Sequence, residues 1–268
     1  MAYTEVGGTQ VHYLVDGQGP GLILIHGTGA DARSNWEHLV ADLVADNTLL
    51  RPDYSGSGGT RDDEGPLSLP LLASQVMAAA DAAGLDAFDV AGYSLGACIA
   101  VQMAADHPGR VRSLTLLGGL ISGDDVRLQL EFGLWQHLIH TDRPALARLI
   151  LLTGFSPDFL ASWSPQQIEE TLQLILEGNW WEGMARQVAL DLTLDIRALL
   201  PAVSCPTLVI GCEHDQMVPP AHARALAAAI ARARYAELPA GHLAPLECPG
   251  AFVSMLRDFV DEVRRQGG

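Results

Sequence analysis

A serine in a short glycine-bounded segment could carry nucleophilic chemistry. The segment Gly92-Tyr93-Ser94-Leu95-Gly96 matches the pattern G-x-S-x-G, directly after the apolar run at residues 88–91 and before a helical stretch of small residues. A serine at a tight strand-to-helix turn projects its hydroxyl above the sheet, and the glycines avoid clashes with the neighbouring strand and helix. This context favours a catalytic nucleophile at Ser94 over an ordinary turn.

An activated serine needs a general base and a carboxylate that orients the base. Asp215 follows the predicted strand at residues 207–210, and His242 follows the predicted strand at residues 234–238. Because the carboxyl ends of parallel strands meet at one edge of a sheet, we expect the three side chains to lie together. The sequence therefore predicts that His242 takes the proton of Ser94 and that Asp215 orients the imidazole.

Two competing interpretations involve neighbouring acidic residues. Asp124 and Asp125 follow the predicted strand at residues 111–117, and either is an alternative to Asp215 as the orienting acid. The Cys-Glu-His-Asp run that ends at Asp215 consists of residue types that can bind metal ions, so a metal site is the second alternative. Four consecutive residues cannot all face one ion, however, and no distant His or Cys pair supports them. We therefore predict no metal site.

The composition excludes several classes of function. The chain has 268 residues, 49% of them hydrophobic, and a formal net charge of −16. Such a surface repels phosphate groups, so we predict no nucleic-acid and no membrane partner. All 16 basic residues are arginine. Without lysine the chain has neither a Walker A loop nor a Schiff-base centre. We predict a small-molecule substrate and no cofactor.

The cysteines and the N-terminus indicate a cellular compartment. The 4 cysteines show no paired spacing, and the N-terminal residues lack the basic and apolar regions of a signal peptide. No apolar run approaches the roughly 20 residues that span a bilayer. We therefore predict a cytoplasmic protein. The sequence gives no residue-level argument for an oligomeric state.

Two kinds of pattern divide the chain. Short apolar strands alternate with helical patterns over residues 1–120 and again over residues 198–268. This rhythm predicts an α/β core with a mostly parallel sheet flanked by helices. Residues 121–197 instead show helical periodicity without strand signals. We expect them to form a helical cap inserted into a discontinuous core.

The expected cap is rich in tryptophan. It holds four of the 5 tryptophans, among them Trp135, Trp180 and Trp181. These three are candidate substrate-binding residues, and an aromatic cap over a serine site favours an apolar or cyclic substrate. Because Trp180 and Trp181 are adjacent, we expect at most one of that pair to face the pocket.

Over essentially its whole length the chain resembles the α/β-hydrolase fold superfamily, in its capped branch of esterases and lactonases. The resemblance rests on G-x-S-x-G, on the chain order Ser94, Asp215, His242, and on a turn that begins His26-Gly27. Residues 51–58 also resemble the D-x-x-G-x-G turn of the family, which is structural.

The resemblance implies roles for backbone groups and a reaction. The N–H groups of Thr28 and Leu95 would form an oxyanion hole. The reaction would be cofactor-independent cleavage of an ester, lactone or thioester of a small apolar or cyclic substrate through an acyl-enzyme. A non-hydrolytic tailoring enzyme, with His242 as the base of an elimination, is the alternative. A carbon–carbon hydrolase, a perhydrolase and a non-catalytic ligand-binding module are further alternatives.

Overall fold

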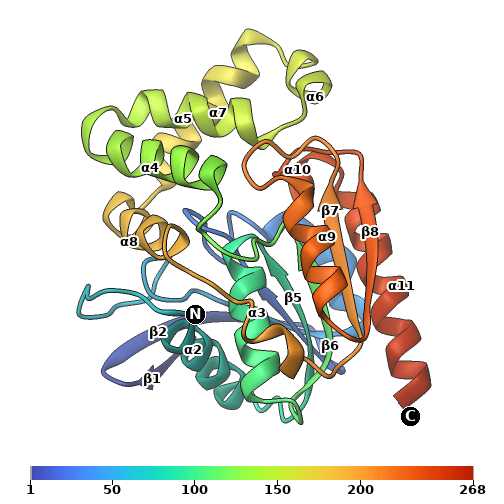
Figure 1. Ribbon diagram of the computed structural model, residues 1–268. Helices are drawn as coiled ribbons and strands as arrows, with labels where there is room; N and C mark the ends of the chain where they lie inside the picture. The colour runs from blue at the N-terminus through green and yellow to red at the C-terminus, as the bar shows by residue number, and fades with distance from the viewer. Residues whose placement is uncertain (1, 268) are drawn as a thin grey trace.

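One eight-stranded sheet forms the centre of the molecule (Figure 1). The computed structural model describes residues 2–267. The strands follow the order β1-β2-β4-β3-β5-β6-β7-β8, and β2 runs in the opposite direction to the other seven. They are β1 (Ala2–Val6), β2 (Thr9–Asp16), β3 (Gly21–Ile25), β4 (Thr48–Pro52), β5 (Phe88–Tyr93), β6 (Val111–Leu117), β7 (Thr207–Cys212) and β8 (Ala233–Leu238).

Helices pack on both faces of the sheet, which buries every residue of β3 and β5. On one face lie α2 (Leu69–Ala82), α3 (Leu95–Asp106) and α9 (Pro220–Ala229), and on the other α1 (Val40–Leu43) and α11 (Pro249–Gly267). The shorter helical elements are η1 (Glu37–Leu39), η2 (Val44–Asp46), η3 (Leu200–Ala202) and α10 (Ala244–Glu247). This architecture confirms the predicted α/β fold with a mostly parallel sheet.

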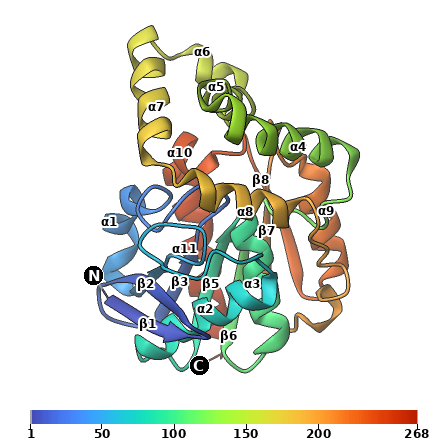
Figure 2. The same cartoon turned by 90° about the vertical axis from the view of Figure 1, so that its left-hand side faces the viewer.

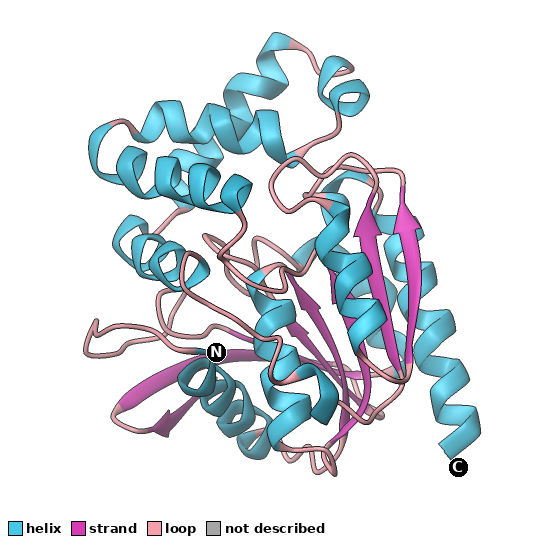
Figure 3. Cartoon of the chain, in the orientation of Figure 1, coloured by secondary structure: helices cyan, strands magenta, loops and turns pink. Residues whose placement is uncertain are grey.

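Five α-helices lie between β6 and β7 in the chain and above the carboxyl ends of the strands (Figures 2 and 3). They are α4 (Val126–Thr141), α5 (Arg143–Gly154), α6 (Pro157–Ala161), α7 (Pro165–Gly178) and α8 (Trp181–Asp191). An aspartate or serine side chain caps the first turn of each of α4 to α7, and a proline occupies that turn in α5, α6 and α7. These local signals explain where four of the helices begin. No helix within residues 2–267 is long and apolar enough to cross a membrane.

The two chain segments that lead into and out of these helices lie side by side. Ser122 and Asp195 form an antiparallel bridge. The Gly123 amide donates to the Leu194 carbonyl at 2.8 Å, and the segment continues with a bond from Ile196 N to the carbonyl of residue 121 at 3.1 Å. The chain therefore enters and leaves the helical segment through one hydrogen-bonded pair of segments, which we call the neck.

Candidate active site

Ser94 occupies a sharp turn between β5 and α3, at the carboxyl edge of the sheet. Its φ of 55° and ψ of −121° are uncommon for a residue with a side chain. A Cβ on Gly92 would lie 2.3 Å from the Gly96 carbonyl oxygen, and a Cβ on Gly96 would lie 2.3 Å from the Ile25 carbonyl oxygen. Both glycines are thus required by close backbone approach, which fixes Ser94 in a strained conformation.

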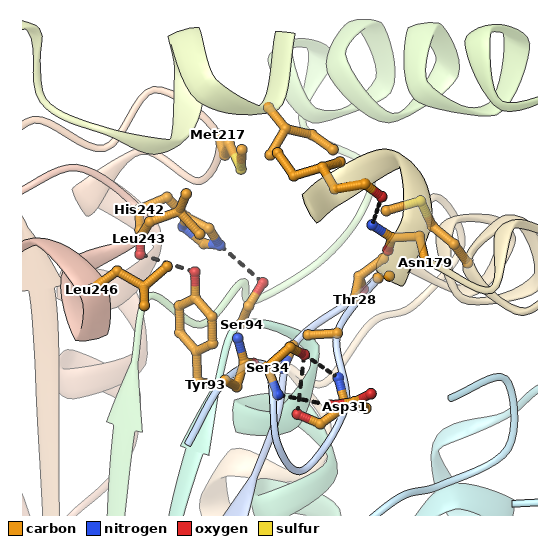
Figure 4. A pocket seen from close by; sticks show the side chains of 18 of the residues that line it. Thr28, Asp31, Ser34, Tyr93, Ser94, Asn179, Met217, His242, Leu243 and Leu246 are labelled. Atoms are coloured by element: carbon orange, nitrogen blue, oxygen red, sulfur yellow. Dashed lines mark hydrogen bonds between the residues drawn. The ribbon is translucent and has the colours of Figure 1, made fainter. Parts of the chain in front are cut away.

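The structure brings Ser94, His242 and Asp215 together from three loops that follow β5, β8 and β7. His242 Nε2 lies 3.0 Å from Ser94 Oγ (Figure 4). On the other side of the ring, His242 Nδ1 lies 2.6 Å from Asp215 Oδ2. All three residues are buried, with 4 to 6% of their surface exposed. With the proton on Nδ1, the imidazole donates to the carboxylate and can accept from the serine hydroxyl.

Asp215 is held by its own loop. Its Oδ1 accepts hydrogen bonds from the amides of Met217 at 2.9 Å and Val218 at 2.8 Å, so the carboxylate has partners on both oxygens. The two alternative acids are engaged elsewhere. Asp124 bonds to Ser122 and Arg197, and Asp125 accepts from the first amides of α4. The carboxylate that contacts His242 is therefore that of Asp215.

The turn after β3 lies directly beside Ser94, where a Cβ on Gly27 would lie 3.0 Å from Ser94 Cβ. The Gly27 amide donates to Asn35 Oδ1 at 2.9 Å, and the Gly29 amide donates to Gln187 Oε1 at 2.8 Å. Within residues 2–267, the amides of Thr28 and Leu95 have no acceptor. These are the two N–H groups that the family resemblance suggests for an oxyanion hole.

An apolar cavity of about 630 Å³ opens above Ser94 and His242, between the sheet edge and the helical segment. Met217, Leu243 and Leu246 lie near the His242 side, and Asp31, Ser34 and Asn179 form a polar region beside Thr28 (Figure 4). The helical segment contributes mainly large apolar side chains, namely Phe132, Trp135, Ile150, Leu151, Phe155, Leu174, Ile175 and Met184. The cavity therefore suits a substrate that is largely apolar.

Of the three tryptophans proposed as substrate-binding residues, one lines this cavity. Trp135 does so, and its indole donates to Glu131 at 3.3 Å. Trp180 lines a smaller neighbouring cavity of about 300 Å³. Trp181 is buried in the core beneath Arg143, whose guanidinium lies 5.2 Å from the ring centroid. The structure therefore corrects the assignment of Trp180 and Trp181, because neither side chain lines the cavity that contains Ser94.

Burial shifts the titration of several groups around the site. It raises the pKa of the Tyr93 phenol well above its ordinary value, so the neutral hydroxyl donates to the His242 carbonyl at 3.0 Å. It lowers the pKa of His26, which favours a neutral ring. Burial also raises the pKa of Asp191 to about 7, although a hydrogen bond from Thr28 opposes this rise.

Three polar side chains near the turn after β3, namely Asn35, Gln187 and Asp191, were not identified by the sequence motifs. Each contacts the turn through a hydrogen bond, two of them from α8. No motif marks them, because their contacts depend on how distant segments pack. Among residues 2–267, no group of three or more His, Cys, Asp or Glu side chains is arranged to hold a metal ion.

Comparisons with known proteins place this geometry in a family context. A family model described as the alpha/beta hydrolase fold matches residues 20–249. The chain is 47% identical over 260 residues to pyrrolizixenacetamide deacetylase of Xenorhabdus hominickii, covering 97% of this chain and 98% of that protein. It is 29% identical over 265 residues to a candidate carbamate hydrolase, RutD, of Azorhizobium caulinodans, covering 98% and 99% of the two chains.

Solved structures give the same result at the level of the fold. The enol-lactonase from Burkholderia xenovorans LB400 is 29% identical and matches with a TM-score of 0.86, covering 97% of this chain and 100% of that one. A thermophilic esterase from Thermogutta terrifontis has a TM-score of 0.84 at 24% identity, covering 97% of both chains. The second likeness concerns the fold alone.

Proposed function

The chain belongs to the α/β-hydrolase fold family, and on that premise we propose that it is a serine hydrolase that removes a small acyl group from an apolar or cyclic amide or ester. The proposal is carried by the hydrogen-bonded series Ser94, His242, Asp215 at the base of an apolar cavity. The 47% identity to a protein named as a deacetylase of an acetamide extends the predicted substrates from esters, lactones and thioesters to amides.

The first half of the reaction forms an acyl-enzyme. His242 Nε2 accepts the hydroxyl proton while Ser94 Oγ attacks the substrate carbonyl carbon, and Asp215 stabilises the resulting imidazolium. The carbonyl oxygen becomes an oxyanion, which accepts hydrogen bonds from the Thr28 and Leu95 amides. By analogy with other acyl-transfer sites, each donor contributes about 3 kcal/mol to stabilisation of the transition state.

The second half releases the products. The imidazolium donates its proton to the leaving nitrogen or oxygen, and the bond between that atom and the carbonyl carbon breaks. His242 then takes a proton from water, and the hydroxide oxygen attacks the acyl carbon. Collapse of this second intermediate returns the proton to Ser94 and releases a carboxylic acid. The sum is one water consumed for each amide or ester cleaved.

The volume of the cavity and its lining favour a substrate larger than its acyl group. A two-carbon acyl group occupies only a small part of about 630 Å³, so the remainder of the molecule contacts Phe132, Trp135 and Phe155. These side chains belong to residues 121–197, which we propose act as a cap on a core formed by residues 1–120 and 198–268. The neck between the two segments supports this division.

Labelling with a fluorophosphonate, read by intact mass, tests the nucleophile. We expect one adduct on the wild type and none on Ser94→Ala. Ser74→Ala is a matched control, since Ser74 lies on the exposed side of α2 and its hydroxyl donates to the Leu71 carbonyl. This variant should label like the wild type. A folded wild type that forms no adduct, or a Ser94→Ala variant that keeps turnover, would contradict the proposal.

A matched substrate panel then tests the bond that is cleaved. Acetamides and acetate esters of the same cyclohexyl or aryl group should release acetate in a Ser94-dependent reaction, followed by mass spectrometry of both products. The butyryl analogues test whether the acyl group is small. Faster cleavage of the butyryl compounds than of the acetyl compounds would contradict the proposal that the leaving group, and not the acyl group, occupies most of the cavity.

A further inference from the structure

Two buried side chains of α8 bond to the turn after β3, residues 26–29, and not to the proposed catalytic residues. We call this turn the oxyanion turn, because it would supply the Thr28 amide to the oxyanion. Asp191 Oδ2 accepts a hydrogen bond from Thr28 Oγ1 at 2.6 Å, and Gln187 Oε1 accepts from the Gly29 amide at 2.8 Å. Gln187 is 0% exposed and Asp191 is 1% exposed. Because the side chains are four residues apart, one face of α8 contacts two consecutive residues of the turn.

These bonds select which amide of the turn stays available. Asn35 on one side accepts from Gly27 and Gln187 on the other accepts from Gly29, so the amide between them, that of Thr28, has no acceptor within residues 2–267. The Thr28 hydroxyl is turned toward Asp191. The turn is therefore fixed at three points, and two of them belong to the helical segment.

The two α8 side chains keep polar atoms without partners. Asp191 Oδ1 and Gln187 Nε2 are both buried with no hydrogen bond within residues 2–267. Leaving such atoms unpaired is unfavourable, and an apolar pair at these positions would anchor the helix to the core without that penalty. The presence of two polar residues here is explained if each is needed for the one hydrogen bond that it accepts from the turn.

We propose that Asp191 and Gln187 are positioning residues that hold the Thr28 amide toward the substrate carbonyl, so that the helical segment helps to build the oxyanion hole. The inference rests on the proposed function, because an oxyanion forms only in that reaction. An interaction that matters in the transition state alone lowers kcat when it is lost and leaves KM nearly unchanged.

The variants Thr28→Val, Asp191→Leu and Gln187→Leu each remove one of the two hydrogen bonds. We expect kcat to fall roughly 10- to 100-fold in each, since small displacements in an active site have effects of this size. KM should stay within about threefold of the wild type. Thr28→Ser and Asp191→Asn keep a hydroxyl donor and an oxygen acceptor, and they should restore most of kcat.

Arg186 provides a matched control on the same helix. Its guanidinium bonds to Asp62 at 2.6 and 3.0 Å and to the Gly65 carbonyl at 2.9 Å, so it also ties α8 to the core, but not to the oxyanion turn. Arg186→Met should lower Tm while kcat stays unchanged. A fall in kcat as large as that of Thr28→Val would overturn the inference, because general loosening of α8 would then explain it.

A double variant completes the test. Thr28→Val combined with Asp191→Leu should be no slower than the slower single variant, since both remove one bond; multiplied losses would overturn the inference. Thr28 is only half-buried, so its variants carry the test if Asp191→Leu does not fold. Wild-type turnover that depends on Ser94, with all these variants unaffected, overturns this inference alone. A wild type without such turnover overturns the proposed function as well.

Discussion

Strand β5 has a buried polar cluster at each end, and the two clusters are built differently. Near its first residue, Asp89 accepts from Ser113 at 2.6 Å, from Arg112 at 3.1 Å and from Arg264 at 2.9 Å. Just beyond its last residue, Ser94 Oγ lies 3.0 Å from His242 Nε2 and faces a cavity. Every partner at the first end belongs to the protein, whereas the second end leaves groups available to a substrate.

The two ends of β5 therefore serve different purposes: the Asp89 end contributes to stability, and the Ser94 end can interact with a bound molecule. A buried carboxylate with cationic partners is costly to disturb but offers nothing to a ligand. A hydroxyl and an imidazole beside an apolar space can exchange a proton with a bound molecule. Changes at the Ser94 end should therefore alter turnover, and changes at the Asp89 end should alter the free energy of unfolding.

The largest expected effect is at the Ser94 end. Asp215→Asn should lower kcat about 10⁴-fold, because the amide favours the wrong imidazole tautomer. Asp124→Asn is the control, since Asp124 bonds to Arg197 and not to His242. Steady-state kinetics of both variants, with Tm measured alongside, check the prediction. Equal losses in the two variants, or a larger loss in Asp124→Asn, would reverse the assignment of the acid.

At the other end of β5, Asp89→Asn should lower the free energy of unfolding by about 3 kcal/mol, because two arginines lose their buried counter-charge. The folded fraction should keep wild-type kcat. Urea unfolding and active-site-titrated kinetics measure the two quantities separately. A fall in kcat per folded molecule would show that the two ends of β5 are not independent.

Asp191 differs from Asp89, because it is a buried carboxylate to which no cationic side chain is bonded within residues 2–267. Burial raises its pKa to about 7, so the folded protein keeps a proton that the unfolded chain loses near pH 4. Stability from this group is present at low pH and is lost as pH rises through 7. Tyr54, Cys98 and His242 are titratable groups that interact electrostatically with Asp191.

Asp191→Asn removes this titration. Between pH 5.5 and pH 7 the wild type should lose about 2 kcal/mol of unfolding free energy relative to the variant, since each pH unit contributes about 1.4 kcal/mol. Urea unfolding of both proteins at several pH values measures the difference. A constant difference across this range would contradict the raised pKa.

The smallest expected effect concerns the cavity wall. Leu174 lines the cavity although it is 70% exposed, so Leu174→Ser should raise KM for an apolar substrate about fivefold, or roughly 1 kcal/mol, without loss of folding. Leu152→Ser is the control, because Leu152 is 61% exposed and does not line the cavity. Parallel kinetics of the two variants provide the measurement. Equal changes in KM in the two variants would contradict a contact between Leu174 and the substrate.

Much of the core could be predicted because its strands are buried on both faces. The apolar runs at residues 21–25 and 111–117 predict β3 and β6 with their observed bounds. β1 is not predicted, because its residues alternate between half-buried and exposed at the sheet edge. The helical spacing of Trp36, Leu39 and Leu43 predicts a helix at residues 35–43, but the structure has only one turn of α1 there, preceded by the 3₁₀ turn η1.

The site was predictable where a residue follows a strand, and not where it depends on packing. Ser94, Asp215 and His242 each follow a recognisable strand, and parallel topology then brings them to one edge. Gln187 contacts a residue 158 positions away in the chain, which no local pattern reports. The direction of Trp180 and Trp181 likewise depends on how α8 packs on the core.

The neck at Ser122 and Asp195 makes the helical segment an insertion whose two ends lie side by side, and the segment does not bridge separate parts of the sheet. Because its two ends lie hydrogen-bonded to each other, the segment spans no distance between β6 and β7. Its length and helix count can change while the register of those strands stays fixed. Replacement of the segment at this one junction would give the cavity above Ser94 a different wall, provided that the new helices supply their own hydrogen-bond acceptors for Thr28 and Gly29.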